Sequence, residues 1–294
     1  MNDPYPAICD YDGSDYQGSF WERGGRAYED GAEELALRRL LPPSGERLLE
    51  VGAGAGRNTP RYTGFREITL LDYSRSQLEQ AQRRLGTGPR YRFVVADVYQ
   101  MPFAEGVFDT ATMIRTLHHM QDPAAALQRV RQSLGEGGVF ILEFANKRNL
   151  KAIARWLLRR QTWNPFDPAP VEFANLNYDF HPRAVAGWLK AAMFHVERRL
   201  PVSHLRLGWL KRHVPLRLLL GVEGGLQRLG STWLYTPSVF VRARAAASIE
   251  DPRGRFWRCP NCDSLEMAET DEGVHCRQCG RLWIRRGGIY EFRG

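Results

Sequence analysis

The stretch that decides the fold is ERLLEVGAGAGR, residues 46–57. It predicts an apolar strand that runs directly into a loop with glycine at positions 52, 54 and 56. Because glycine has no side chain, a ligand can approach the backbone of such a loop closely. The helix expected after the loop would add free N–H groups and the positive end of its dipole.

A dinucleotide-binding loop would read G-x-G-x-x-G. Here the third glycine, Gly56, comes one residue early, and Arg57 occupies the place where that pattern has glycine. The loop therefore disfavours a nicotinamide dinucleotide and suits a ligand that has no pyrophosphate.

Strand and helix patterns alternate after this loop. Strands are expected near 67–74, 90–98, 108–119 and 138–146, and helices near 76–86 and 122–138. The alternation predicts an α/β fold with a doubly wound, mostly parallel seven-stranded sheet. The expected domains are an N-terminal helical cap (1–45), the main domain (46–245) with a basic insertion at 147–217, and a small separate domain (257–294).

Two acidic residues follow successive predicted strands. Asp72 ends the second strand, where a carboxylate can accept from both ribose hydroxyls, and Asp97 follows the third, where it can accept from an adenine amino group. An isolated Asp at a strand end usually caps a turn or a helix. Together, after this glycine loop, the two residues favour a ligand that contains adenosine.

Four segments resemble the successive motifs of class I S-adenosylmethionine (SAM)-dependent methyltransferases, namely LLEVGAGAGR, LLDYS, VVADVYQMPFAEGVFD and MIRTLHHM. Their style is nearest to the broad group that contains the ubiquinone- and menaquinone-biosynthesis methyltransferases. The resemblance covers about residues 46–146 and concerns the cofactor, not the methyl acceptor. It implies a Rossmann-like methyltransferase with SAM as its cofactor.

The resemblance also implies a set of residues at the cofactor. The glycines would line its methionine and ribose end, the acidic residue before them would support the loop, and the residues after the second and third strands would hold ribose and adenine. The set is Glu50, Gly52, Gly54, Gly56, Asp72, Tyr73, Asp97, Val98 and Arg115.

His118 and His119 stand at the far end of the fourth predicted strand, which would face the reaction centre. They are the candidate catalytic residues if the acceptor must lose a proton. The other interpretation is that one contacts the cofactor region and the other packs in the core. No Asp/Asn-Pro-Pro-Tyr/Phe signature follows this strand, and Cys9 is the one cysteine outside a C-terminal cluster, so methylation of DNA bases is disfavoured.

The cluster reads C-x2-C, thirteen residues, C-x2-C, with Cys259, Cys262, Cys276 and Cys279. This spacing predicts a structural zinc ion held by four thiolates, with no open position for catalysis. The segment CRQCGRLWIRRGGIYEF resembles the C-terminal half of the small zinc-ribbon activator subunit of eukaryotic tRNA, rRNA and release-factor methyltransferases. In that family Tyr-Pro-Ile and Gly-Ile-Pro occupy the places of residues 282–284 and 288–290, so two prolines are missing here. The resemblance implies an activator fused in cis, and the alternative is a generic zinc ribbon.

The net charge of +8 is concentrated in residues 147–217, which alone carry +10. Such a segment attracts an anionic substrate, RNA or a membrane surface, or it forms solvated helix faces. The expected function is methyl transfer to a small-molecule or lipid-like acceptor; the alternatives are an RNA (tRNA or rRNA) methyltransferase and a non-enzymatic scaffold. No signal peptide, membrane span or obligate protein partner is expected, which predicts a cytoplasmic protein.

Overall fold

The computed structural model describes residues 6, 12–13, 25–230, 233–246 and 254–293. Much of the predicted N-terminal cap, most of the predicted linker at 246–256, and Cys9 lie outside these residues. The first described helix, α1 (Ala27–Leu40), is the helical part of the cap.

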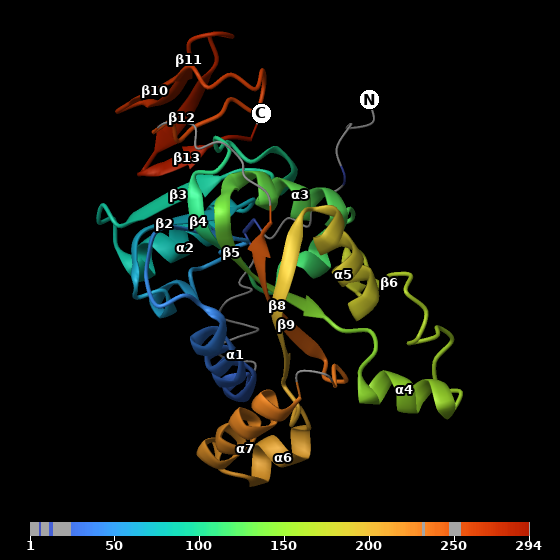
Figure 1. Ribbon diagram of the computed structural model, residues 1–294. Helices are drawn as coiled ribbons and strands as arrows, with labels where there is room; N and C mark the ends of the chain where they lie inside the picture. The colour runs from blue at the N-terminus through green and yellow to red at the C-terminus, as the bar shows by residue number, and fades with distance from the viewer. Residues whose placement is uncertain (1–5, 7–11, 14–24, 231–232, 247–253, 294) are drawn as a thin grey trace.

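The centre of the molecule is one sheet that carries helices on both faces (Figure 1). Its strands between residues 45 and 245 are β1 (Gly45–Val51), β2 (Phe65–Asp72), β3 (Tyr91–Val95), β4 (Phe108–Met113), β5 (Leu134–Ala145), β8 (Phe194–Val202) and β9 (Ser238–Ala245). They lie in the order β3-β2-β1-β4-β5-β9-β8, with β9 antiparallel to both of its neighbours. The doubly wound, mostly parallel class is therefore confirmed.

Successive apolar residues of the strands serve opposite faces of the sheet. Leu48 and Leu70 belong to the core under α1 and α2, whereas Leu49 and Leu71 belong to the core under α3 and α5. This is why the strands read as continuous apolar runs: both faces of a parallel sheet are buried. The helices are α2 (Arg75–Leu85), α3 (Pro123–Ser133) and α5 (Pro182–Ala191).

Gly56 is followed by a single 3-10 turn, η2 (Thr59–Arg61), where the sequence led us to expect a helix. Pro60 lies within this turn. Gly64 then comes against the backbone of the preceding loop, where an added Cβ would lie 2.0 Å from the carbonyl oxygen of Pro43. The close return of the chain to β2 leaves no room for further helical turns. Two more 3-10 turns, η3 (Val98–Gln100) and η4 (Leu117–His119), follow β3 and β4.

The C-terminal segment extends the same sheet, which reaches 11 strands. Its strands are β10 (Met267–Thr270), β11 (Gly273–Cys276), β12 (Leu282–Arg286) and β13 (Ile289–Glu291). β13 runs parallel to β3, with Tyr290 opposite Val94. The sheet is larger than the seven strands expected because β13 pairs with the edge strand β3 and so adds the ribbon strands to it. This pairing joins distant residues, so the local sequence did not indicate it.

Residues 147–230, apart from α5 and β8 of the central layers, form an outer layer that follows β5 along the chain. It contains α4 (Leu150–Leu157), a hairpin of β6 (Val171–Ala174) and β7 (Asn177–Asp179), and the helices α6 (Gly208–His213) and α7 (Leu216–Leu229). The hairpin lies within a Pro- and aromatic-rich segment, residues 163–180. No helix in the described part of the chain is long and apolar enough to cross a membrane.

Candidate active site

The glycine loop begins where β1 ends, and its shape depends on the absence of side chains. Gly52 and Gly54 have φ of 68° and 52°, a region that other residues rarely adopt. A Cβ on Gly52 would lie 2.1 Å from Oγ1 of Thr116, so β4 and the loop approach each other more closely than alanine permits. At Gly54 the nearest atom to such a Cβ is 4.0 Å away, and this side of the loop faces open space.

Asp72 connects the end of β2 to the glycine loop. Its carboxylate accepts hydrogen bonds from the backbone N–H of Gly54 at 2.7 Å and of Ser74 at 2.9 Å. A carboxylate has acceptor positions for about four hydrogen bonds, so these contacts are compatible with binding of ribose hydroxyls as well. The residue thus shapes the turn and presents its carboxylate to the space beside Gly54.

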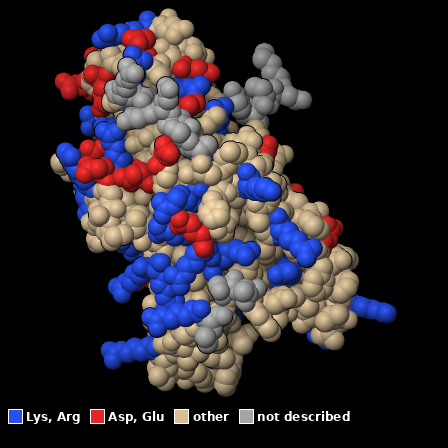
Figure 2. All heavy atoms as spheres, in the orientation of Figure 1, with Lys and Arg blue, Asp and Glu red and all other residues tan. Residues whose placement is uncertain are grey.

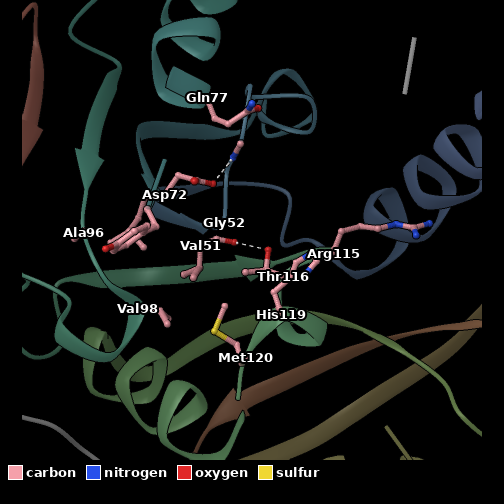
Figure 3. A pocket seen from close by; sticks show the side chains of 13 residues that line it. Val51, Gly52, Asp72, Gln77, Ala96, Val98, Arg115, Thr116, His119 and Met120 are labelled. Carbon is pink, nitrogen blue, oxygen red and sulfur yellow. Dashed lines mark hydrogen bonds between the residues drawn. The ribbon is translucent and has the colours of Figure 1, made fainter. Parts of the chain in front are cut away.

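A pocket opens at the carboxyl ends of β1 to β4, where the strand order reverses on either side of β1 (Figure 3). This switch point is where open α/β sheets bind ligands. The lining residues are Val51, Gly52, Gly54, Leu71, Asp72, Tyr73, Gln77, Ala96, Val98, Arg115, Thr116, His119 and Met120. Apolar walls face one another, and Asp72 lies at one end of the pocket and His119 at the other (Figure 3).

Three of the expected cofactor residues, Glu50, Gly56 and Asp97, lie outside this lining. Gly56 packs against α2, where a Cβ would come within 3.2 Å of Ala81. Asp97 caps η3 by accepting from the backbone N–H of Tyr99 at 2.7 Å, while its neighbours Ala96 and Val98 line the pocket. Asp97 therefore has the turn-capping contact that its position at a strand end made the ordinary interpretation.

Glu50 lies beneath the loop and borders a second, adjoining cavity. It accepts from the hydroxyl of Thr59 at 2.6 Å and of Tyr62 at 3.2 Å. Burial raises the pKa of Glu50 to about 7, and these two hydrogen bonds offset only part of that rise. The expected supporting role is compatible with this geometry, in which Glu50 joins the strand before the loop to the turn after it.

Arg115 lines the pocket with its backbone, but its side chain extends away toward α1 (Figure 3). Its Nε donates to the buried Glu33 at 2.7 Å, and the other oxygen of Glu33 accepts from Arg57 at 2.6 Å. Burial pushes the pKa of Glu33 upward, but Arg115 and Arg57 outweigh it and hold that pKa below its ordinary value. Arg115 has a φ of 58°, a strained value for a residue with a side chain.

Glu33 was missed by the sequence reasoning, although a signal was present. It lies between Ala32 and Ala36 on the face that α1 buries, and a glutamate on a buried helix face requires a partner. The partners come from the glycine loop and from the end of β4, so α1 anchors both sides of the pocket.

The two histidines differ in their position. His119 lines the pocket, and its Nδ1 lies 3.2 Å from the carbonyl oxygen of Leu176 in the β6–β7 hairpin. His118 does not line the pocket; its ring centroid is 4.0 Å from that of His119, and its buried Nδ1 has no hydrogen-bond partner in the described part of the chain. Burial lowers the pKa of both rings, so both are neutral near pH 7.

A polar cluster at the end of β5 holds the backbone of Arg115, one of the residues that line the pocket. Glu143 accepts from the backbone N–H of Arg115 at 3.0 Å and from the hydroxyl of Ser238 at 2.6 Å. Burial raises the pKa of the nearby Asp179, at the end of β7, to about 6. His181 does not join this cluster, because it caps α5 by accepting from the backbone N–H of Arg183.

The four cysteines of the C-terminal segment come together. The sulfur atoms of Cys259 and Cys279 are 3.8 Å apart, those of Cys262 and Cys276 are 3.5 Å apart, and all four lie within 4.8 Å of one another. Tetrahedral zinc with Zn–S bonds of about 2.3 Å needs sulfurs about 3.8 Å apart. The donor set and its spacing therefore fit a structural zinc ion, with no fifth side chain needed.

The ribbon contacts the catalytic domain through backbone hydrogen bonds as well as rings. Phe292 donates from its N–H to Val95 at 2.8 Å, and Trp257 stacks on Phe103 with ring centroids 6.0 Å apart. The guanidinium of Arg293 lies 5.2 Å from the ring centroid of Tyr73, which lines the pocket. This contact between the C-terminus and the pocket had no signal in the local sequence.

Comparison with known proteins agrees with this geometry. Residues 49–142 match the family model described as a methyltransferase domain. The chain is 29% identical over 177 residues to a demethylmenaquinone methyltransferase of Clavibacter sepedonicus, a match that covers 55% of this chain and 71% of that protein. It is 33% identical over 109 residues to the O-methyltransferase cnsE of Penicillium expansum, covering 35% of this chain but only 40% of that protein.

Among solved structures, the fold resembles a chain from the complex between the Haloferax volcanii Trm112 methyltransferase activator and a putative methyltransferase. The TM-score is 0.56 at 14% identity, covering 79% of this chain and 96% of that chain. At this identity the likeness concerns the fold. It supports the Rossmann-like arrangement that the sheet order and the pocket already display.

Proposed function

Because residues 49–142 form a methyltransferase domain, we propose that this chain is a SAM-dependent enzyme that methylates a small-molecule or lipid-like acceptor. The observation that carries the proposal is the pocket at the switch point of the sheet. It joins an adenosine-compatible end, at Asp72 and Gly54, to a histidine, His119, at the other end.

The residues of the pocket fit SAM in size and chemistry. Gly54 leaves space where a side chain would project, Asp72 offers acceptors for ribose hydroxyls, and Tyr73 and Val98 offer apolar contact for an adenine ring. In this proposal Gly52 acts indirectly by permitting the approach of Thr116 to the loop. When bound, SAM supplies a methyl group on a sulfonium, whose transfer to an acceptor is an in-line displacement.

The protein's contribution to this reaction is chiefly positioning. His119 is neutral near pH 7 and lies at the pocket, so it can take a proton from an acceptor hydroxyl. His118 is set back behind it, and we assign it a supporting role. Glu143 holds the backbone of Arg115, which fixes the end of β4 between the two ends of the pocket.

The acceptor class is inferred from two sources. The two relatives described above are a demethylmenaquinone methyltransferase and an O-methyltransferase, which both point to small organic acceptors. In this chain the β6–β7 hairpin reaches η4 through the contact of Leu176 with His119, so the aromatic segment covers the acceptor end of the pocket. Phe180 in this segment is buried and stacks with Tyr178, which gives the cover an apolar interior.

Isothermal titration with SAM, comparing Asp72→Asn and Asp109→Asn, tests the cofactor site. Asp109 also accepts from backbone N–H groups, those of Glu46 and Arg47, but at the opposite end of the sheet. Loss of a hydrogen bond to a charged group costs about 1.5–3 kcal/mol, so we expect roughly 10- to 100-fold weaker binding for Asp72→Asn only. Equal affinity of both variants with the parent would exclude Asp72 from the site.

Transfer from labelled SAM into a fractionated cell extract tests the acceptor class. We expect label in the small-molecule or lipid fraction, and His119→Ala to reduce its incorporation while SAM affinity stays within a few-fold of normal. Label in RNA would favour the alternative of an RNA methyltransferase, which the +10 segment keeps open. RNA binding through phosphates would also weaken steeply with salt.

A further inference from the structure

Three helices of the 147–230 layer, α4, α6 and α7, expose large apolar side chains. The most exposed on each are Leu157 of α4 at 67%, Trp209 of α6 at 63% and Leu218 of α7 at 61%, and Trp233 just after α7 is 72% exposed. Scattered apolar residues on a protein surface are ordinary, but several of this size at one end of the molecule are not.

These helices share one end of the molecule. Figure 1 shows α4, α6 and α7 at the end opposite the ribbon. The connection is close: the N–H of Leu150, at the start of α4, donates to the carbonyl of Tyr235, in the segment that follows α7. Arg148 lies over the ring of the same Tyr235. We call the exposed faces of α4, α6 and α7, which lie at this same end of the molecule, the helical surface.

The charge on the helical surface has a single sign. α4 and α6 contain no Asp or Glu, and the one acidic residue of α7, Glu223, is buried. Exposed cations are interleaved with the apolar residues: Lys151, Arg155, Arg159, Arg160, Arg212 and Arg217. In Figure 2, Lys and Arg spread over the lower half of the molecule around α6 and α7, and Asp and Glu lie mainly in the upper half.

We propose that the helical surface docks on an anionic phospholipid bilayer. Helices with Leu and Trp beside Lys and Arg lie in the interface of a membrane, with apolar groups in the acyl boundary and cations among the headgroups. The surface has both components and lacks the exposed carboxylates that such a bilayer would repel.

The same composition disfavours the other occupants. A second copy of the chain would bring the cations of two identical surfaces together, which a self-complementary interface avoids. RNA would use the cations, but it offers nothing to exposed leucines, because nucleic-acid interfaces are polar and charged.

Docking would bring the bilayer close to the acceptor end of the pocket. The segment that follows α4 leads into the hairpin that contacts His119, and the residue two positions before α6, Arg206, lies 3.4 Å from Glu29 of α1. The first connection ends at a residue of the pocket, His119, and the second ends on α1, the helix whose Glu33 holds Arg115. The surface itself is inferred without the proposed reaction, and the bilayer binds whether or not methyl transfer occurs.

Co-sedimentation with vesicles tests the proposal. We expect the full chain to bind vesicles of equal parts phosphatidylcholine and phosphatidylglycerol and not vesicles of phosphatidylcholine alone. The double variant Arg155→Gln/Arg217→Gln should bind the mixed vesicles at least roughly tenfold more weakly, because each cation near an anionic surface raises the affinity roughly fivefold. Its matched control is Arg66→Gln/Arg83→Gln, two exposed cations outside the helical surface, which should bind as the parent does.

A second pair of variants tests the apolar part. Trp209→Ser should weaken binding to the mixed vesicles several-fold, whereas Leu282→Ser, at an exposed position on the ribbon, should not. All these side chains are exposed, so unchanged circular dichroism and melting temperature will verify the folded state.

Three results would overturn the docking proposal. One is failure to bind mixed vesicles, and another is binding that neither helical-surface variant changes. The third is occupation of the helical surface by another partner. It would appear as RNA retention, or as a dimer, that Trp209→Ser abolishes, in a chain that does not bind vesicles. Vesicle binding without detectable methyl transfer would leave the surface standing and count against the proposed function alone.

Discussion

The guanidinium of Arg293 lies over the ring of Tyr73, 5.2 Å from its centroid. Arg293 follows the last strand of the ribbon, and Tyr73 lines the pocket at the end of β2. The C-terminal segment thus reaches the proposed cofactor site itself. If Tyr73 packs on adenine, the ribbon influences cofactor binding through the other side of the ring.

Replacing Arg293 tests this connection. A cation over an exposed aromatic ring contributes about 0.5–1 kcal/mol, so we expect Arg293→Gln to weaken SAM binding roughly two- to fivefold. Arg285→Gln is the matched control. The guanidinium of Arg285 makes a similar contact, 5.0 Å from the ring centroid of Tyr290, and neither residue lines the pocket. Isothermal titration of both variants distinguishes them, and equal effects would mean that the ribbon acts only on stability.

The glycines of the loop should separate stability from binding. Gly52→Ala places a Cβ against Thr116, so we expect the free energy of unfolding to fall by more than about 2 kcal/mol. The Cβ of Gly54→Ala would meet no protein atom closer than 4.0 Å but would project toward the pocket, so SAM affinity should fall more than stability does.

The matched control for these glycines is Gly86→Ala, because Gly86 also has a positive φ, 82°, and no protein atom lies near its added Cβ. This variant should lower the free energy of unfolding by about 1 kcal/mol without changing SAM affinity. Chemical denaturation and titration give the two readouts, and a Gly54→Ala variant that binds SAM normally would contradict the proposed site.

Glu50 should give the stability a characteristic dependence on pH. Its pKa is raised from 4.5 to about 7 in the folded chain, so between these values the folded state holds a proton that the unfolded state has lost. Stability therefore falls as pH rises from about 4.5 to 7, by roughly 2–3 kcal/mol from this residue. Glu50→Gln removes the titration and should flatten the curve in that window, as measured by denaturation across pH. An unchanged difference between pH 5 and 7 in the variant would mean that other groups cause it.

Zinc removal should destabilise the main sheet as well as the ribbon. Because β13 pairs with β3 and Phe292 donates to Val95, loss of the metal releases an edge of the catalytic sheet. We expect about one zinc per chain, and Cys276→Ser or chelation should lower the melting temperature by several degrees, with weaker SAM binding. Cys9→Ser, outside the cluster, should change neither. A chelated chain with unchanged melting and SAM affinity would contradict the coupling.

The local sequence was sufficient for the class of fold and for much of the pocket. Three short-range patterns correspond to features of the structure. The glycine loop adopts positive φ at Gly52 and Gly54, Asp72 at the end of β2 accepts from the loop, and the four cysteines come together. Prediction was weaker where one residue type serves two different roles. Asp at a strand end can hold a ligand or cap a turn, and the structure shows Asp97 capping η3.

What the sequence by itself determined is therefore the α/β class, the glycine turn and the cysteine cluster, because these depend on residues close together in the chain. Only the tertiary structure decided the buried contact of Glu33 with Arg115, the pairing of β13 with β3 and the position of Arg293 over Tyr73. Each joins residues far apart in sequence, so its free energy is gained only after the intervening chain has been ordered. A local pattern can indicate that a buried group such as Glu33 needs a partner, but it does not identify that partner.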